Sequence, residues 1–213
     1  MVVTETVVKP FPTPTAEVAA VDFWFDPACP WAWLTSRWIH NVEQVRPIRT
    51  TFRLMSLAML NEDKDLSADV LLRLMGPVRV VQAVLEDHGH DAARVLYTEL
   101  GNRKFVEQRQ QTPEVVTEAV VAAGFDARYA EAFSSTEHDD AIRASHDAGL
   151  DLVGPDVGTP IIRAEGEAFF GPIVAKAPAG EEAGRLWDGF RIVMSIPGFY
   201  EIKKTRDTQP DFG

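Results

Sequence analysis

The single cysteine of the chain lies in the stretch Val21-Asp22-Phe23-Trp24-Phe25-Asp26-Pro27-Ala28-Cys29-Pro30-Trp31-Ala32-Trp33. Residues 21–25 have the aromatic and β-branched composition of a strand, and residues 33–45 have the periodicity of a helix. The cysteine therefore falls where a strand gives way to the first turn of a helix. Unpaired N–H groups and the helix dipole favour an anion there, so we expect an ionised sulfur that faces an open cleft.

The residue three positions after Cys29 is Ala32. A redox site with two cysteines would have its resolving thiol at that position. A single cysteine also excludes an internal disulfide and a cysteine-rich metal site. The sequence thus predicts reactive sulfur chemistry that depends on one thiol.

The rest of the chain completes an α/β pattern. Residues 48–57 alternate as a second strand, and residues 66–150 contain mostly helical segments, interrupted at Gly76-Pro77, at Gly89 and at Gly149. Two strands over residues 160–163 and 168–170 share a hairpin turn at Glu165-Gly166 and precede a helix over 180–195 and a last short helix over 199–205.

This order predicts a thioredoxin-like fold with a large α-helical insertion. We expect a loose leader over residues 1–20, a thioredoxin-like domain over 21–65 and 151–213, and a helical lid over 66–150. A second landmark of such a fold is an X–Pro bond in the cis form that faces the active cysteine. The Thr159-Pro160 pair precedes the third strand, where it would offer a backbone edge to an extended substrate or a thiol cofactor.

Several motifs together resemble one family. They are Phe23-Trp24-Phe25-Asp26-Pro27, Cys29-Pro30-Trp31, Thr35-Ser36-Arg37-Trp38, Met55-Ser56-Leu57-Ala58-Met59-Leu60-Asn61-Glu62, Gly101-Asn102-Arg103, Ser145-His146-Asp147-Ala148-Gly149, Val157-Gly158-Thr159-Pro160 and Phe169-Phe170-Gly171-Pro172. With these motifs, the chain resembles over nearly its whole length the actinobacterial DsbA-like proteins known as mycothiol-dependent nitroreductases.

The resemblance implies a homodimer with a helical lid and electrons drawn from the low-molecular-weight thiol mycothiol as co-substrate. It implies that Cys29 is the catalytic nucleophile. The expected thiol- and substrate-binding residues are Pro30, Trp31, Asn61, Thr159 and Pro160.

The chain departs from that family at its active site. Characterised members have Cys-Pro-Trp-Cys, whereas this chain has Cys29-Pro30-Trp31-Ala32. We therefore predict a monothiol cycle, in which the cysteine takes up one mycothiol unit or attacks a mycothiolated substrate. A second mycothiol or a mycoredoxin-like protein then releases it. The sequence alone is compatible with a natural variant and with an engineered alanine.

Two other functions fit the same pattern. One is a transferase or isomerase of the kappa-class glutathione transferase type, in which the residue at the start of the first helix activates a cofactor thiol without forming a disulfide. The other is a binding or chaperone-like module that kept the fold and lost the redox pair. No flavin, nicotinamide or metal motif points to a different electron route.

Composition and charge limit the classes of partner that the protein could bind. The formal charge is −11 and no dense Lys/Arg stripe occurs, which argues against nucleic acid. The short basic cluster of residues 203–206 is interpreted as a solvated helix end. No apolar run suggests a membrane span, and the N-terminus lacks the features of a secretory signal, so we expect a cytoplasmic protein.

For most of the other candidate functional residues, a structural role is the simpler interpretation. Asp26 could shuttle protons as a buried acid, but capping of the helix from an exposed loop is favoured. His88-Gly89-His90 is interpreted as a turn between helices rather than a metal site, and His146 as a packing histidine. Of the nearby tryptophans, Trp31 is expected to form a wall of the binding site, whereas Trp33 and Trp38 belong to the core.

Overall fold

The computed structural model describes residues 18–213 and has at its centre a four-stranded sheet in the order β2-β1-β3-β4. The strands are β1 (Ala19–Phe25), β2 (Ile48–Leu54), β3 (Ile161–Ala164) and β4 (Glu167–Phe170). β1 runs parallel to β2 and antiparallel to β3, which pairs antiparallel with β4. The mixed sheet, with its parallel β1–β2 pair, confirms the predicted thioredoxin-like core.

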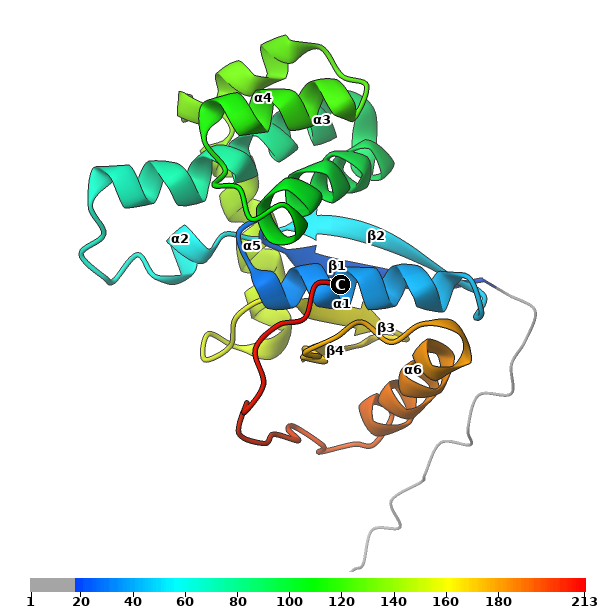
Figure 1. The fold of residues 1–213 in the computed structure, drawn as a ribbon. Helices are drawn as coiled ribbons and strands as arrows, with labels where there is room; N and C mark the ends of the chain where they lie inside the picture. The colour runs from blue at the N-terminus through cyan, green and yellow to red at the C-terminus, as the bar shows by residue number, and fades with distance from the viewer. Residues whose placement is uncertain (1–17) are drawn as a thin grey trace, which may run out of the picture.

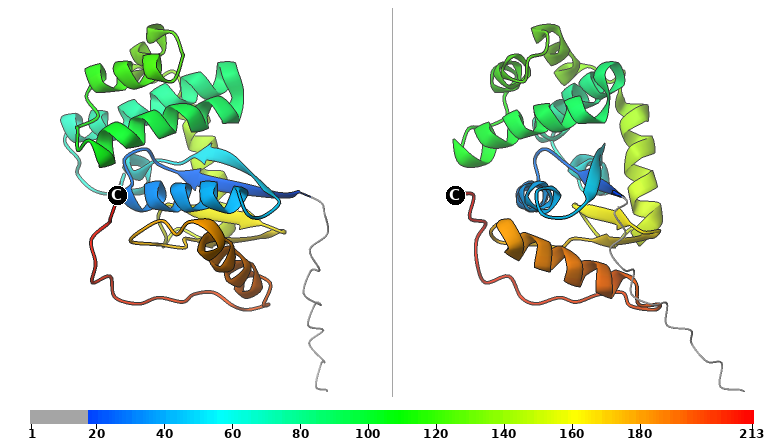
Figure 2. Two further views of the ribbon diagram at one scale, coloured as in Figure 1. Left: turned by 45° about the vertical axis from the view of Figure 1, so that its right-hand side comes forward. Right: turned by 90° about the vertical axis from the view of Figure 1, so that its right-hand side faces the viewer.

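Within residues 18–213, six α-helices surround the sheet (Figure 1). They are α1 (Pro30–Glu43), α2 (Leu57–Leu60), α3 (Ala68–Gly101), α4 (Pro113–Ala122), α5 (Asp139–Val153) and α6 (Gly180–Met194), with a π-helical turn at Asn102–Val106 and a 3₁₀ segment at Ala127–Ser134. α1 and α6 cover one face of the sheet and α5 the other, while α3 and α4 lie above one edge (Figure 2).

Side chains of β1 alternate between the two faces of the sheet and pack against different elements on each face. Phe23 and Phe25 point to the α1 side, where Phe25 stacks on Tyr97 of α3 with ring centroids 4.0 Å apart. Trp24 points to the α5 side, and its indole N–H donates to the Ser145 carbonyl at 2.9 Å. Because side chains alternate along a strand, one short segment anchors both the insertion and α5.

The helical insertion rests on α1 through a very close approach. A Cβ built on Gly101, at the end of α3, would lie only 2.1 Å from the Trp33 ring. The absence of a side chain at Gly101 therefore lets the ring pack directly on the helix backbone. This contact seats the insertion above the helix that carries the cysteine.

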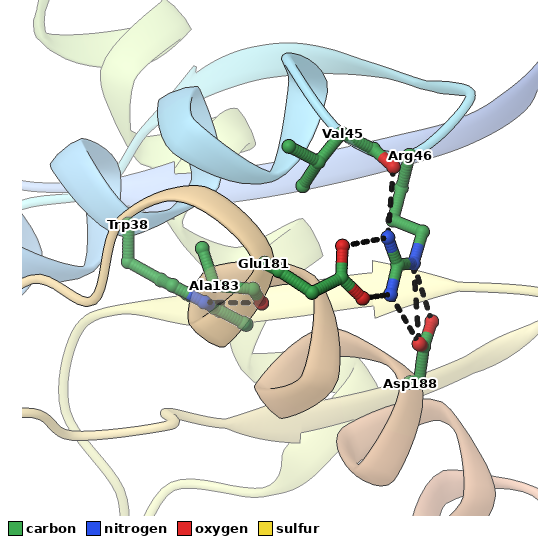
Figure 3. Close-up of polar contacts among 6 residues, drawn as sticks. All are labelled: Trp38, Val45, Arg46, Glu181, Ala183 and Asp188. Carbon is green, nitrogen blue, oxygen red and sulfur yellow. Dashed lines mark hydrogen bonds and ion pairs between the residues drawn. The ribbon is translucent and has the colours of Figure 1, made fainter.

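A salt-bridge cluster fastens α6 to the loop that follows α1. Arg46, in the loop after α1, pairs with Glu181 at 2.6 Å and with Asp188 at 2.7 Å (Figure 3). Nearby, the indole N–H of Trp38 donates to the Ala183 carbonyl at 3.1 Å. These bonds join α1 and α6 into one layer, and they confirm that Trp38 is a core residue.

Several local predictions are confirmed. Glu165-Gly166 forms the turn between β3 and β4. The chain also breaks helical geometry at Gly89, where φ is +82° within α3.

Other boundaries were predicted wrongly. α3 continues through Pro77, with the Phe133 ring packed against the adjacent Gly76, and α5 runs past Gly149 as far as Val153. β2 stops at Leu54 because Ser56 caps α2. No helix forms over residues 199–205, which run extended.

Residues 1–17 of the predicted leader lie outside the described residues. Within residues 18–213, no helix has both the length and the apolarity needed to cross a membrane.

Candidate functional site

Cys29 stands directly before α1 and is its N-cap residue. The sulfur accepts a hydrogen bond from the backbone N–H of Ala32 at 3.4 Å. Pro30 takes the first helical position, where an N–H would have no helical partner and its loss is harmless. The sequence order Cys-Pro therefore directs the sulfur at the free N–H groups of the helix.

The opposite wall of the site comes from the loop before β3. The Cys29 thiol donates to the carbonyl oxygen of Thr159, with Sγ and O 3.5 Å apart. The hydroxyl of Thr159 donates in turn to the Trp24 carbonyl at 3.2 Å, and the Thr159–Pro160 peptide is cis. Thus the fold brings together the cysteine and the Thr-Pro pair, which are far apart in the sequence.

The sulfur is enclosed rather than exposed. Cys29 is 4% exposed, and this burial raises the pKa of its thiol to about 11. The Ala32 N–H and the charge of Arg206 act to lower the pKa, and the charge of Asp26 acts to raise it. The expectation of an ionised sulfur in an open cleft is therefore wrong for this arrangement, because desolvation outweighs the helix N-terminus.

Asp26 is a fully buried acid that ties two segments together. One carboxylate oxygen accepts from the Ala28 N–H at 2.6 Å, and the other accepts from the Leu57 N–H at the start of α2, also at 2.6 Å. Burial raises the pKa of this carboxyl to about 6, although both hydrogen bonds and the charge of Lys104 oppose the rise. The predicted exposed cap of the first helix is thus wrong: the carboxylate is buried and accepts from the first N–H of α2.

The remaining predicted ligand contacts differ in their placement. Trp31 is half-buried beside the sulfur, and the guanidinium of Arg206 lies 4.9 Å above its ring. Asn61 ends α2, where its side-chain amide donates to the Leu57 carbonyl at 2.7 Å and its oxygen accepts from Lys64. In the described part of the chain, no hydrogen bond links Asn61 to the sulfur or to Thr159.

Three polar residues near the site were not predicted from the sequence. Lys104, on the π-helical turn, has its pKa lowered by burial, and the charge of Asp26 opposes that change. Gln111 donates to the Pro27 carbonyl at 3.4 Å, while its buried side-chain oxygen has no partner within residues 18–213. Arg206 belongs to the cluster interpreted as a solvated helix end: residues 203–206 are exposed, as predicted, but they form no helix, and the Arg206 guanidinium lies over the Trp31 ring.

The histidines have structural partners. His88 contacts the Tyr129 hydroxyl at 2.8 Å, and His90 contacts the Phe52 carbonyl at 2.7 Å. His146 is buried and accepts from the Ser56 N–H at 3.2 Å, which confirms its packing role. Within residues 18–213, no group of three or more His, Cys, Asp or Glu side chains is arranged to hold a metal ion.

Known proteins share this architecture. The probable DsbA oxidoreductase SCO1869 from Streptomyces coelicolor superposes with a TM-score of 0.57 at 15% identity, covering 89% of this chain and 94% of that one. The cytosolic disulfide reductase DsbM from Pseudomonas aeruginosa superposes with a TM-score of 0.52 at 17% identity, covering 81% and 97% of the two chains. At these identities the likeness shows the DsbA-like thioredoxin fold.

Sequence comparison identifies the family. The uncharacterised protein Rv2286c of Mycobacterium tuberculosis is 29% identical over 201 residues, which cover 89% of this chain and 83% of that protein. The model of the family described as "Rv2466c-like: Mycothiol-dependent nitroreductase Rv2466c" matches residues 28–204, from the residue before the cysteine to the extended C-terminal segment. This chain therefore belongs to the Rv2466c-like family of mycothiol-dependent nitroreductases, a family of thiol-dependent oxidoreductases.

Proposed function

We propose that this protein exchanges thiols and disulfides through Cys29 alone, with mycothiol as its low-molecular-weight thiol. The observation that carries the proposal is the pairing of one sulfur with Ala32. The alanine is fully buried, its N–H points at the sulfur, and no other cysteine exists in the chain. A mixed disulfide on this sulfur can therefore be resolved only by a thiol from outside.

The proposed cycle has two exchange steps. In the first, the Cys29 thiolate attacks the mycothiol-side sulfur of a mycothiolated substrate, forms a mixed disulfide with mycothiol and releases the substrate thiolate, which takes up a proton. In the second, the thiolate of another mycothiol attacks the mycothiol sulfur of that mixed disulfide, regenerates Cys29 and leaves mycothiol disulfide. The net reaction consumes one mycothiol for each substrate thiol that is freed. A mycoredoxin-like protein could replace the second mycothiol.

Access to the sulfur is part of this proposal. The thiol is buried and protonated in the described arrangement, since its pKa is raised to about 11. Exchange therefore requires a local opening at the walls formed by Trp31 or by Thr159 and Pro160. Pro30, Trp31 and the Thr159–Pro160 edge would bind the incoming disulfide, with Asn61 at the border of the site.

Nitro compounds are a second proposed substrate class, because the family is described by that activity. Reduction of a nitro group to a nitroso group consumes two mycothiols and yields one mycothiol disulfide and one water. With a single cysteine, both electrons must come from thiols supplied at each turnover. We also propose, from the family resemblance, a cytoplasmic homodimer.

A transferase of the kappa-class glutathione transferase type is the alternative. The observation that favours it is the hydrogen bond from the protonated Cys29 thiol to Thr159, since a group that only orients a cofactor thiol need not ionise. In that case the cysteine would bind the cofactor without forming a disulfide.

Mass spectrometry after treatment with oxidised mycothiol separates these functions. Thiol exchange predicts one mycothiol unit on Cys29, removed by free thiol, and none on Cys29→Ser. Absence of any adduct on the folded protein would contradict thiol exchange. Turnover that survives in Cys29→Ser would instead support the transferase.

A further inference from the structure

The C-terminal segment of residues 195–213, here called the strap, returns from α6 to the thiol site. It leaves α6 at Met194 and runs without helix or strand to the C-terminus. Both views in Figure 2 place its end beside the start of α1 and below the insertion. Nearly the whole sheet domain separates the beginning of this segment from its end (Figure 1).

Specific contacts hold the end of the strap. The Asp211 N–H donates to the Ala175 carbonyl at 2.7 Å, and the Asp211 side chain pairs with Lys176 at 2.9 Å. The half-buried Phe212 ring packs on Phe105 with centroids 5.2 Å apart. Phe105 stacks in turn on Trp33 of α1, at 5.8 Å. The strap therefore ends on the same aromatic layer that supports the cysteine helix.

Between these anchors and α6, Arg206 lies on the active-site tryptophan. Its guanidinium is 4.9 Å above the centre of the Trp31 ring, and Trp31 is two residues from Cys29. A cation in this position over an indole is attracted by the ring and is held in place by it. The strap thus places a positive charge at the edge of the site, in addition to the charges of Asp26 and Lys104.

The ionisable groups that act on the sulfur come from several elements. Asp26, in the loop before α1, disfavours an ionised sulfur, whereas Arg206 favours it. Tyr97 of α3 is buried and neutral, since its pKa is raised well above its usual value. Lys104 of the π-helical turn interacts with Asp26. Among these groups, Arg206 is the cation whose charge acts on the sulfur itself.

We propose that Arg206 is a positioning residue of the thiol site, held on Trp31 by the strap so that its charge favours the ionised sulfur of Cys29 during exchange. This role deepens the proposed function, because thiol exchange produces thiolates in both of its steps.

The test is the pH profile of Cys29 alkylation by iodoacetamide, which does not require the proposed function. Removing one nearby surface charge in Arg206→Gln should slow alkylation at pH 8 about threefold and displace the profile to higher pH. Arg206→Lys should restore most of the rate, and the exposed Lys203→Gln, on the same strap, should match wild type. Phe212→Ala, which frees the strap but keeps Arg206, should slow alkylation by a smaller factor.

Unchanged or faster alkylation in Arg206→Gln would overturn the proposal, since a faster rate would mean that the side chain only covers the sulfur. Circular dichroism of each variant checks that it folds. If oxidised mycothiol forms no adduct on wild type while Arg206→Gln still slows alkylation, the proposed function fails and the assignment of Arg206 stands.

Discussion

The thiol of Cys29 donates a hydrogen bond to the carbonyl oxygen of Thr159, with Sγ and O 3.5 Å apart. The bond requires a proton on the sulfur, and the burial that accompanies it raises the pKa of the thiol to about 11. An incoming disulfide that binds along the Thr159–Pro160 edge would compete for the same carbonyl. In the resting site, the thiol thus occupies the carbonyl of the proposed substrate-binding edge.

The reactivity of Cys29 should follow this raised pKa. Because only the thiolate is nucleophilic, alkylation by iodoacetamide should rise about tenfold for each pH unit from pH 7 to beyond pH 9. Rates measured by mass spectrometry should reach their midpoint near pH 11 rather than near the ordinary cysteine value. Cys29→Ser serves as the blank. A plateau below pH 9 would show that the sulfur ionises more easily than its burial implies.

Asp26 should make stability depend on pH. Burial raises the pKa of its carboxyl from 3.8 to about 6, so the folded state holds the proton more tightly than the unfolded chain. The stabilising contribution is full below about pH 4 and is lost as pH rises through 6. Relative to Asp26→Asn, wild type should therefore lose about 2 kcal/mol of unfolding free energy between pH 4 and pH 7.

Urea unfolding of both proteins at several pH values measures this difference. Asp156→Asn, which changes an exposed loop carboxyl, should follow wild type over the same range. Parallel curves for wild type and Asp26→Asn would mean that the buried carboxyl titrates at its ordinary value.

The fold could be predicted from the sequence because its signals are local. The strand-to-helix junction at Cys29 is visible in one short stretch, since Pro30 at the first helical position and the alternating aromatic residues before it act on their neighbours. The return of strands after the insertion is likewise marked by a turn at Glu165-Gly166. Each of these features depends on residues close in sequence.

The electrostatics of the site could not be predicted in this way. The pKa of Cys29 depends on how completely distant segments enclose the sulfur. Thr159, which contributes to this enclosure, lies 130 residues after Cys29 in the chain. Asp26 accepts its second hydrogen bond from the distant Leu57 N–H. Arg206 contacts Trp31, although it belongs to a basic cluster whose composition is typical of a solvated helix end. A helix N-terminus signals an anion site only when burial is known as well.

Ala32→Cys should restore a two-cysteine site. Residues 29 and 32 lie three apart at the helix start, with the Ala32 N–H 3.4 Å from Sγ, so a thiol introduced there lies on the same side of the helix as the sulfur. After oxidation the variant should contain no titratable thiol, whereas wild type retains one. A mycothiol adduct on Cys29 should then resolve without added thiol, as followed by mass spectrometry.

Its control is the double variant Cys29→Ser/Ala32→Cys, which keeps the new thiol and lacks the nucleophile. Persistence of the adduct in Ala32→Cys would mean that the introduced sulfur is held away from Cys29, and that more than the missing thiol separates this chain from two-cysteine members of the family.

A side chain at Gly101, where the helix backbone contacts Trp33, should lower the stability of the protein. Gly101 has ordinary helical angles, so alanine there carries no backbone strain, but its Cβ would lie 2.1 Å from the ring. Overpacking of this kind costs about 1–3 kcal/mol, because the Trp33 ring or one of the two helices must shift to make room. Gly189→Ala in α6, where nothing lies within 4 Å, should instead gain up to about 1 kcal/mol from helix propensity. In thermal unfolding, Gly101→Ala should have a lower melting temperature than wild type, whereas Gly189→Ala should not. Equal melting temperatures for Gly101→Ala and wild type would show that the insertion can shift freely over α1.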